Sequence, residues 1–154
     1  MLRGTLSLVS VFLCFVRLLA LTRHPVDRRC THDLIPRVQT LIARARTLKG
    51  LDSRLYTPNI TDHEQKCPSS ALKCFAAEVQ VLTAEWEEFG VRQDLHVDKL
   101  LRSLAKKFKQ AESNCLQCEL LQEENAEKFL NCLLSTLQQM NSLYCIQPTS
   151  KSTL

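Results

Sequence analysis

The sequence predicts an all-α protein, a four-helix bundle with up-up-down-down topology that disulfides hold together. Glycine and proline are scarce, with 3 and 5 of the 154 residues, so the chain has few helix breakers. Apolar residues recur at the spacing of one helix face rather than at the alternating spacing of a strand. The third observation is a set of 8 cysteines, four of them in two short pairs, which behind an apolar leader indicates a disulfide framework.

The first residues of the chain are typical of a cleaved signal peptide. Arg3 supplies the positive charge and residues 6–16 the apolar core. Arg17 interrupts the apolar run, which is shorter than the roughly 20 residues of a spanning helix, so a cleaved signal is favoured over a signal anchor and we expect a secreted protein. The expected organisation is a signal peptide at 1–22, an N-terminal extension at 23–30, one four-helix domain at 31–147 and a disordered tail at 148–154.

The positive charge of the chain is confined to its beginning. Residues 1–30 carry the whole net charge of +4, and the remainder is neutral. A neutral domain provides no field that attracts nucleic acid or an anionic membrane. The four histidines are scattered, and the sequence has no Gly-rich phosphate loop. We therefore expect no enzyme activity, no cofactor or metal, no nucleic-acid partner and no membrane insertion of the mature domain.

Four segments have helical periodicity. They cover residues 31–48, 68–89, 94–111 and 117–144. Lys49 and Gly50 give the first segment a stop signal, and Pro68 suits the first turn of the second. Asp94 is the expected start of the third segment, and Gln117 that of the fourth. Four amphipathic helices of this size bury a sufficient core only as a bundle.

The connection between the first two helices is long and polar. Residues 50–67 lack helical periodicity and contain Asn59-Ile60-Thr61, an N-glycosylation sequon that suits an exposed loop. Antiparallel neighbouring helices are usually joined by 2–8 residues. A longer overhand link fits the up-up-down-down arrangement, in which the first two helices run parallel.

Two cysteine pairs flank the expected starts of the second and fourth helices. Cys67 and Cys74 are close to whole helical turns apart, as are Cys115 and Cys118, so each pair can present its sulfurs on one face. The two helix starts can therefore be joined by the bridges Cys67–Cys115 and Cys74–Cys118. Spacing alone leaves the crossed pairing open. The same four thiols can also form a tetrahedral zinc site, which a secretory leader disfavours.

A third bridge follows from the predicted topology. Cys30 precedes the first helix and Cys145 ends the fourth. These helices are antiparallel in an up-up-down-down bundle, so the two ends meet and a Cys30–Cys145 disulfide is expected. Cys132 is then left over, either as a buried thiol of the fourth helix or as a labile surface one.

The cysteine flanks carry a resemblance to a known family. Leu55-Tyr56-Thr57, the run from Lys73 to Leu82 and the run from Cys115 to Asn125, with Phe129-Leu130 and Gln138 beyond them, are similar to the interleukin-15 family. The similarity covers nearly all of residues 31–142 and is densest at the second and fourth helices. It implies a short-chain four-helix cytokine, and the divergence from the family pattern indicates a non-mammalian interleukin-15 or an interleukin-15-like paralogue.

The resemblance also implies three partners: the interleukin-15 receptor alpha chain, the interleukin-2/15 receptor beta chain and the common gamma chain. Bringing them together would activate lymphocyte signalling. The residues implied for the alpha chain are Tyr56, Glu78, Val81, Leu82, Glu85, Glu119 and Glu123; Asp33 corresponds to the beta-chain contact and Gln138 to the gamma-chain contact. Acidic side chains around an apolar strip suit a receptor surface rich in Arg and Lys.

Each implied contact also has a plainer interpretation. Asp33 can be a helix N-cap, the glutamates and Gln138 an ordinary solvated face, and Val81 or Leu82 part of the core. Leu120 departs from the family, which often has a second glutamate there, so the acidic patch is weaker. The alternative function is a saposin-like lipid-binding domain, which narrow apolar stripes flanked by charges disfavour.

Overall fold

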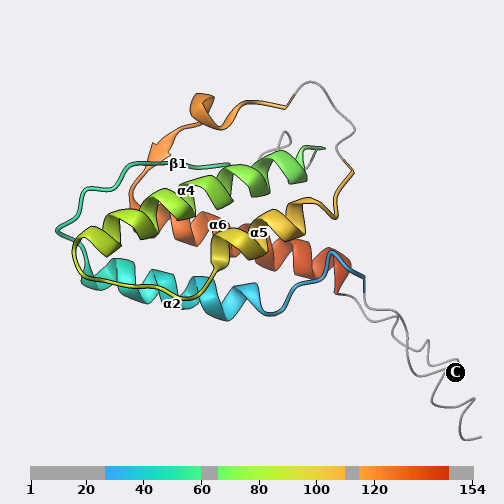
Figure 1. The fold of residues 1–154 in the computed structure, drawn as a ribbon. Coiled ribbons are helices and arrows are strands. Elements are labelled where there is room, and N and C mark those ends of the chain that lie inside the picture. Colours follow the sequence, from blue (N-terminus) through green and yellow to red (C-terminus); the bar gives the residue numbers. More distant parts are fainter. Residues whose placement is uncertain (1–26, 60–65, 110–114, 146–154) are drawn as a thin grey trace, which may run out of the picture.

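Four helices make up most of the described chain. The computed structural model describes residues 27–59, 66–109 and 115–145 (Figure 1). The helices are α2 (Leu34–Thr47), α4 (Pro68–Glu88), α5 (Val97–Ala105) and α6 (Ala126–Tyr144). The expected signal peptide and the tail from Pro148 onward lie outside the described residues.

The helices have the predicted up-up-down-down order. Figure 1 shows α2 and α4 running in one direction and α5 and α6 running back. The main packed pairs are α4 with α5 and α2 with α6. Each parallel pair is joined by a long overhand connection, because the chain must return along the bundle before it can start the next parallel helix. The all-α bundle predicted from the sequence is confirmed.

The core draws apolar side chains from all four helices. Phe75 of α4 and Phe129 of α6 meet with ring centroids 5.5 Å apart. Burying a large apolar side chain stabilises the fold by about 1.5–3 kcal/mol. The largest fully buried side chains are Trp86, Phe75, Phe129, Leu34, Leu41, Leu55, Leu72, Leu82, Leu101, Leu104, Leu130 and Leu133.

The longest helix, α4, begins and ends where its sequence directs. Pro68 occupies its first position, where a missing N–H costs nothing. At the other end the Val91 N–H bonds the Trp86 carbonyl at 2.9 Å and the Gly90 N–H bonds the Glu87 carbonyl at 3.0 Å. Gly90 has φ 80°, which glycine adopts without strain in this Schellman motif. Over the described residues, neither α4 nor any other helix combines the length and apolar character needed to cross a bilayer.

Three predicted helix boundaries are wrong. The third helix was expected over 94–111, but α5 ends already at Ala105. It begins only at Val97, since His96 has left-handed backbone geometry with φ 53°. The fourth was expected from Gln117, but α6 begins at Ala126. Residues 118–124 form a short 3₁₀ turn and a strand instead, and the Asn125 side chain caps α6 by accepting from the Lys128 N–H at 2.9 Å.

A small antiparallel ribbon was not predicted. Strand β1 (Leu55–Tyr56) lies in the first overhand connection and strand β2 (Glu123–Glu124) in the second. Leu55 pairs with Glu124 and Tyr56 with Glu123. Figure 1 shows this ribbon beside α4, on the side away from α2. The two overhand connections therefore meet and form one surface.

Candidate functional site

The ribbon is fixed by a buried apolar side chain and extended by one further backbone hydrogen bond. Leu55 is fully buried in the core. The Thr57 N–H continues the ladder to the Gln122 carbonyl at 2.9 Å. Residues 55–57 and 122–124 are thus fixed in register although they are far apart in sequence.

Glu78 of α4 is the polar anchor of the ribbon. Its Oε2 accepts a 2.8 Å hydrogen bond from the Tyr56 backbone N–H, and the residue is only 9% exposed. Burial raises the pKa of the Glu78 carboxyl, the Tyr56 N–H opposes that rise, and the charges of Glu123 and Glu85 add to it. The carboxylate that the resemblance assigned to a receptor is thus engaged largely inside the molecule.

A second hydrogen bond joins the first overhand connection to α4. The Ser53 hydroxyl donates to Glu85 Oε2 at 2.6 Å, and Ser53 is buried. Glu78 and Glu85 are about two helical turns apart on one face of α4. Together they hold the segment 53–57 along that face, and Tyr56 is left half-buried at its edge.

The adjacent apolar residues of α4 separate into a surface residue and a core residue. Val81 is 46% exposed and Leu82 is 0% exposed. The side chain of Leu82, which the resemblance assigned to the alpha chain, has no surface exposed to a partner, because adjacent helical positions point about 100° apart. Leu82 belongs to the core, and Val81 remains at the surface between the two glutamates.

Two disulfides hold the second overhand connection against the first half of α4. Cys67 is bonded to Cys115 and Cys74 to Cys118, the uncrossed pairing, and the four sulfurs form bridges rather than a zinc site. Cys115 and Cys118 precede the ribbon instead of starting α6. Each such bridge stabilises a fold by about 2–4 kcal/mol.

The outer edge of this surface carries exposed glutamates with one exposed leucine among them. Glu119 and Glu123 are exposed, and neither forms an ion pair within the described residues. Glu124 differs, since Lys128 contacts its carboxylate at 3.1 Å. Leu120 is 70% exposed beside them. We define the acidic surface as Tyr56, Val81, Glu85, Glu119, Leu120 and Glu123, with Glu78 as its anchor.

The remaining predicted contacts lie outside the acidic surface. Asp33 precedes α2, and its exposed side chain makes no capping hydrogen bond. Gln138 is exposed on α6. Asn59 is exposed just after the ribbon, whereas the rest of its sequon lies outside the described residues. Cys132 is half-buried on α6 and takes no part in the three bridges.

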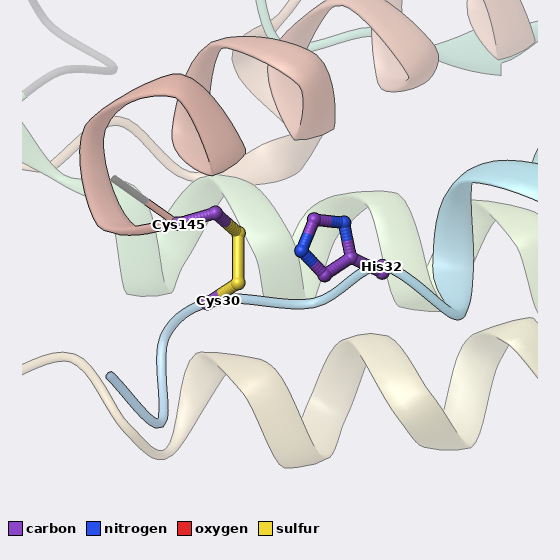
Figure 2. A group of neighbouring side chains, drawn as sticks. All are labelled: Cys30, His32 and Cys145. Atoms are coloured by element: carbon purple, nitrogen blue, oxygen red, sulfur yellow. A yellow bond between two sulfur atoms is a disulfide. The ribbon is translucent and has the colours of Figure 1, made fainter. Parts of the chain in front are cut away.

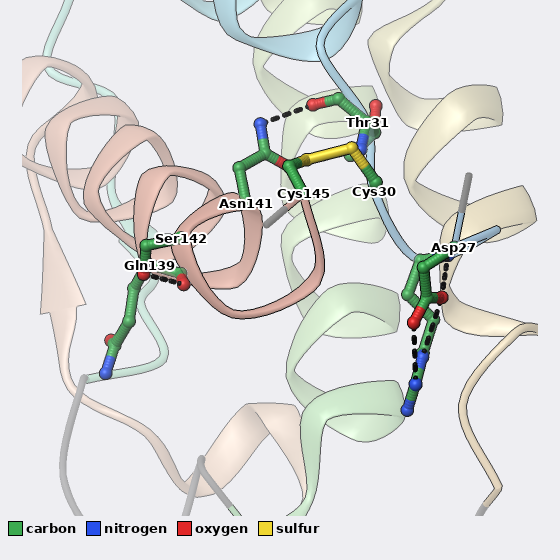
Figure 3. Close-up of a disulfide and its surroundings, with 8 residues drawn as sticks. Asp27, Cys30, Thr31, Gln139, Asn141, Ser142 and Cys145 are labelled. Carbon is green, nitrogen blue, oxygen red and sulfur yellow. Dashed lines mark hydrogen bonds and ion pairs between the residues drawn. A yellow bond between two sulfur atoms is a disulfide. The ribbon is translucent and has the colours of Figure 1, made fainter. Parts of the chain in front are cut away.

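A clamp at the end of the bundle where α2 begins and α6 ends was only partly expected. Cys30 and Cys145 form the third disulfide. Beside it, the Asn141 side chain accepts from the Thr31 N–H at 3.1 Å and donates to the Thr31 carbonyl at 2.6 Å. Figure 3 shows Asn141 and the disulfide side by side. The sequence signal for the clamp was a polar residue one turn after Leu137, on the buried face of α6.

The fold and this surface define a class of protein. An up-up-down-down bundle with two overhand connections is the architecture of four-helix cytokines, which are signalling ligands and not enzymes. Neither the fold nor the acidic surface favours the saposin-like alternative.

The comparisons with known proteins identify the family. The Interleukin 15 family model matches residues 9–141, so the chain belongs to the interleukin-15 family. Interleukin-15 of Oryctolagus cuniculus is 28% identical over 109 residues, which is 70% of this chain and 65% of the relative. Interleukin-15 of Homo sapiens is 31% identical over 90 residues, 57% of this chain and 54% of the relative. Interleukin-15 of Mus musculus is also 31% identical over 90 residues, with the same coverage. The matched part thus spans between about half and two thirds of these relatives.

Proposed function

We propose that this chain is a secreted cytokine that binds an interleukin-15 receptor alpha chain through its acidic surface. Through other faces it brings together the interleukin-2/15 receptor beta chain and the common gamma chain, and so activates lymphocytes. Three disulfides support secretion, since such bridges persist in oxidising compartments. A signal peptide at 1–22 and a glycan on Asn59 belong to the same proposal.

The single observation that carries the alpha-chain proposal is the fixed ribbon. The Tyr56–Glu78 and Ser53–Glu85 hydrogen bonds and two disulfides hold the acidic surface before any partner arrives. A surface that is already ordered loses little conformational entropy on binding. The exposed carboxylates of Glu119 and Glu123 attract a basic partner and speed its association.

The other two contacts are proposed on separate elements. Asp33 has an exposed side chain with no capping role, which leaves its carboxylate available to the beta chain. Gln138 is exposed on α6 next to buried Leu137, which suits a contact of the gamma chain with the outer face of that helix. Because neither residue belongs to the acidic surface, the alpha chain and the signalling chains can bind at the same time.

The test is binding of the folded protein to immobilised alpha, beta and common gamma ectodomains, singly and in combination. We expect the protein to bind the alpha chain in the absence of the other two chains. The resulting complex should then recruit the beta and gamma chains. A response from lymphocytes carrying all three chains completes the test. Absence of binding to every chain and every combination would disprove the proposed function.

A further inference from the structure

The clamp end of the bundle holds a cluster of metal-binding atoms that the receptor proposal does not use. The two sulfurs of Cys30 and Cys145 and a ring nitrogen of His32 all lie within 4.8 Å of one another. Figure 2 shows the His32 ring beside the disulfide, with one nitrogen facing it. Both cysteines are half-buried and His32 is exposed, so solvent and ions reach the cluster.

In the disulfide form the sulfurs are no ligands for a metal, because the thiolate is the species that binds. Reduction changes this. Two thiolates and one imidazole are the donor set that Zn²⁺ prefers, and a water can fill the fourth tetrahedral position. Calcium and magnesium prefer oxygen donors, so the cluster's chemistry selects a borderline-soft ion.

Contacts other than the S–S bond hold the same two segments together, so we expect the three donors to stay close when that bond opens. Asn141, which is 8% exposed, bonds both the N–H and the carbonyl of Thr31, the residue between the two donors Cys30 and His32. The Arg29 guanidinium lies 4.1 Å from the centre of the Tyr144 ring, next to Cys145. Asp27 pairs with Arg29 at 2.8 Å and offsets its positive charge.

We propose that Cys30, His32 and Cys145 form a redox-gated zinc site. A dithiol reductant transfers two electrons to the disulfide, the S–S bond breaks, and two protons give the thiols of Cys30 and Cys145 while the reductant becomes a disulfide. Zn²⁺ then binds both sulfurs and the His32 ring, and two protons leave. The ion replaces the covalent link between the start of α2 and the end of α6.

The experiment measures the alkylation rate of each cysteine separately. The folded protein is partly reduced with a phosphine, which takes up the oxygen of a water as both thiols form, and is then pulsed with iodoacetamide with or without Zn²⁺. Peptide mapping by mass spectrometry gives the alkylation of each cysteine. We expect Zn²⁺ to slow alkylation of Cys30 and Cys145 at least about tenfold, to leave the other cysteines unchanged, and to lose its effect when a chelator is added.

Matched histidine variants test the third ligand. His32→Asn removes the ring nitrogen, and we expect it to abolish most of the protection. His96→Asn is the control, because His96 is exposed at the start of α5 and has the left-handed backbone that Asn tolerates; it should keep the protection. Equal alkylation with and without Zn²⁺, equal protection of all cysteines, or full protection in His32→Asn would overturn the proposal. Loss of helical circular dichroism when this one bridge opens would also overturn it.

Discussion

The backbone N–H of Tyr56 donates a 2.8 Å hydrogen bond to the carboxylate of Glu78, and this bond joins the ribbon to α4. The sequence pattern is compatible with a solvated surface position for this glutamate, but in the fold its side chain is buried and holds the ribbon. The Glu78 carboxylate is therefore buried, lies close to two other glutamates and accepts a hydrogen bond from one N–H.

Glu78 makes the folded state sensitive to pH in a defined direction. Burial, with smaller contributions from Glu123 and Glu85, raises its pKa above the ordinary 4.5. Between 4.5 and the raised value the folded protein binds more protons than the unfolded chain, so this group makes the free energy of unfolding fall as pH rises. We expect Glu78→Gln to remove that fall, as measured by urea unfolding across the acidic range.

The control for this variant is Glu87→Gln, which changes an exposed glutamate of the same helix. It should keep the pH dependence of the wild-type protein. An identical pH dependence in wild type and Glu78→Gln would show that the buried carboxylate does not contribute.

Charge reversal tests the acidic surface. The double variant Glu119→Lys, Glu123→Lys should slow association with the alpha chain by on the order of tenfold and reduce its salt dependence, since electrostatic steering acts mainly on the association rate. Surface plasmon resonance at two salt concentrations measures both. The pair Glu87→Lys, Glu88→Lys changes the net charge equally at the exposed end of α4 and should have little effect. Equal slowing by both double variants would assign the effect to net charge alone.

Adjacent residues of α4 should respond in opposite ways. Leu82→Ala removes a side chain that is 0% exposed and should lower the free energy of unfolding by about 2–5 kcal/mol. Val81→Ala changes a residue that is 46% exposed and should cost less than about 0.5 kcal/mol while weakening alpha-chain binding. Thermal unfolding and binding assays on the two variants measure this. Unchanged binding by stable Val81→Ala would remove Val81 from the interface.

Asn141 should matter more for stability than an exposed asparagine of the same helix. Asn141→Ala leaves the part-buried N–H and carbonyl of Thr31 without their side-chain partner, and we expect the free energy of unfolding to fall by about 1 kcal/mol, the lower end of the range for a group left unsatisfied. Hydrogen exchange at the Thr31 amide should accelerate. Asn131→Ala, which removes only an exposed bond to the Glu127 carbonyl, is the matched control; equal losses in both variants would contradict the clamp.

The beta and gamma contacts predict a separation of binding from signalling. Asp33→Lys and Gln138→Ala should each reduce signalling roughly tenfold, which corresponds to a loss of about 1.4 kcal/mol of binding free energy, and leave alpha-chain binding intact. Asp94→Lys and Gln80→Ala change exposed residues of matching chemistry elsewhere and serve as controls. Receptor phosphorylation in cells and alpha-chain binding measure the two outputs. Full signalling by either test variant would remove that residue from its proposed contact.

The helix boundaries show where the local apolar pattern no longer predicts the secondary structure. Periodicity extended the fourth helix back to Gln117, yet Leu120 is 70% exposed and Glu123–Glu124 form a strand. The competing interactions there are the bridge at Cys118, the ladder to Tyr56 and the cap by Asn125. The apolar periodicity of one segment carries no information on strand partners more than 60 residues away.

The sequence alone determined the helical class, the order of the helices and the family. Apolar spacing, breaker residues and the length of the first connection act locally, so they can be read along the chain. Tertiary structure decided which of Val81 and Leu82 reaches solvent, that Glu78 anchors a ribbon, and that Asn141 holds Thr31. These depend on burial and on hydrogen bonds between distant segments, and such contacts exist only once the bundle has closed.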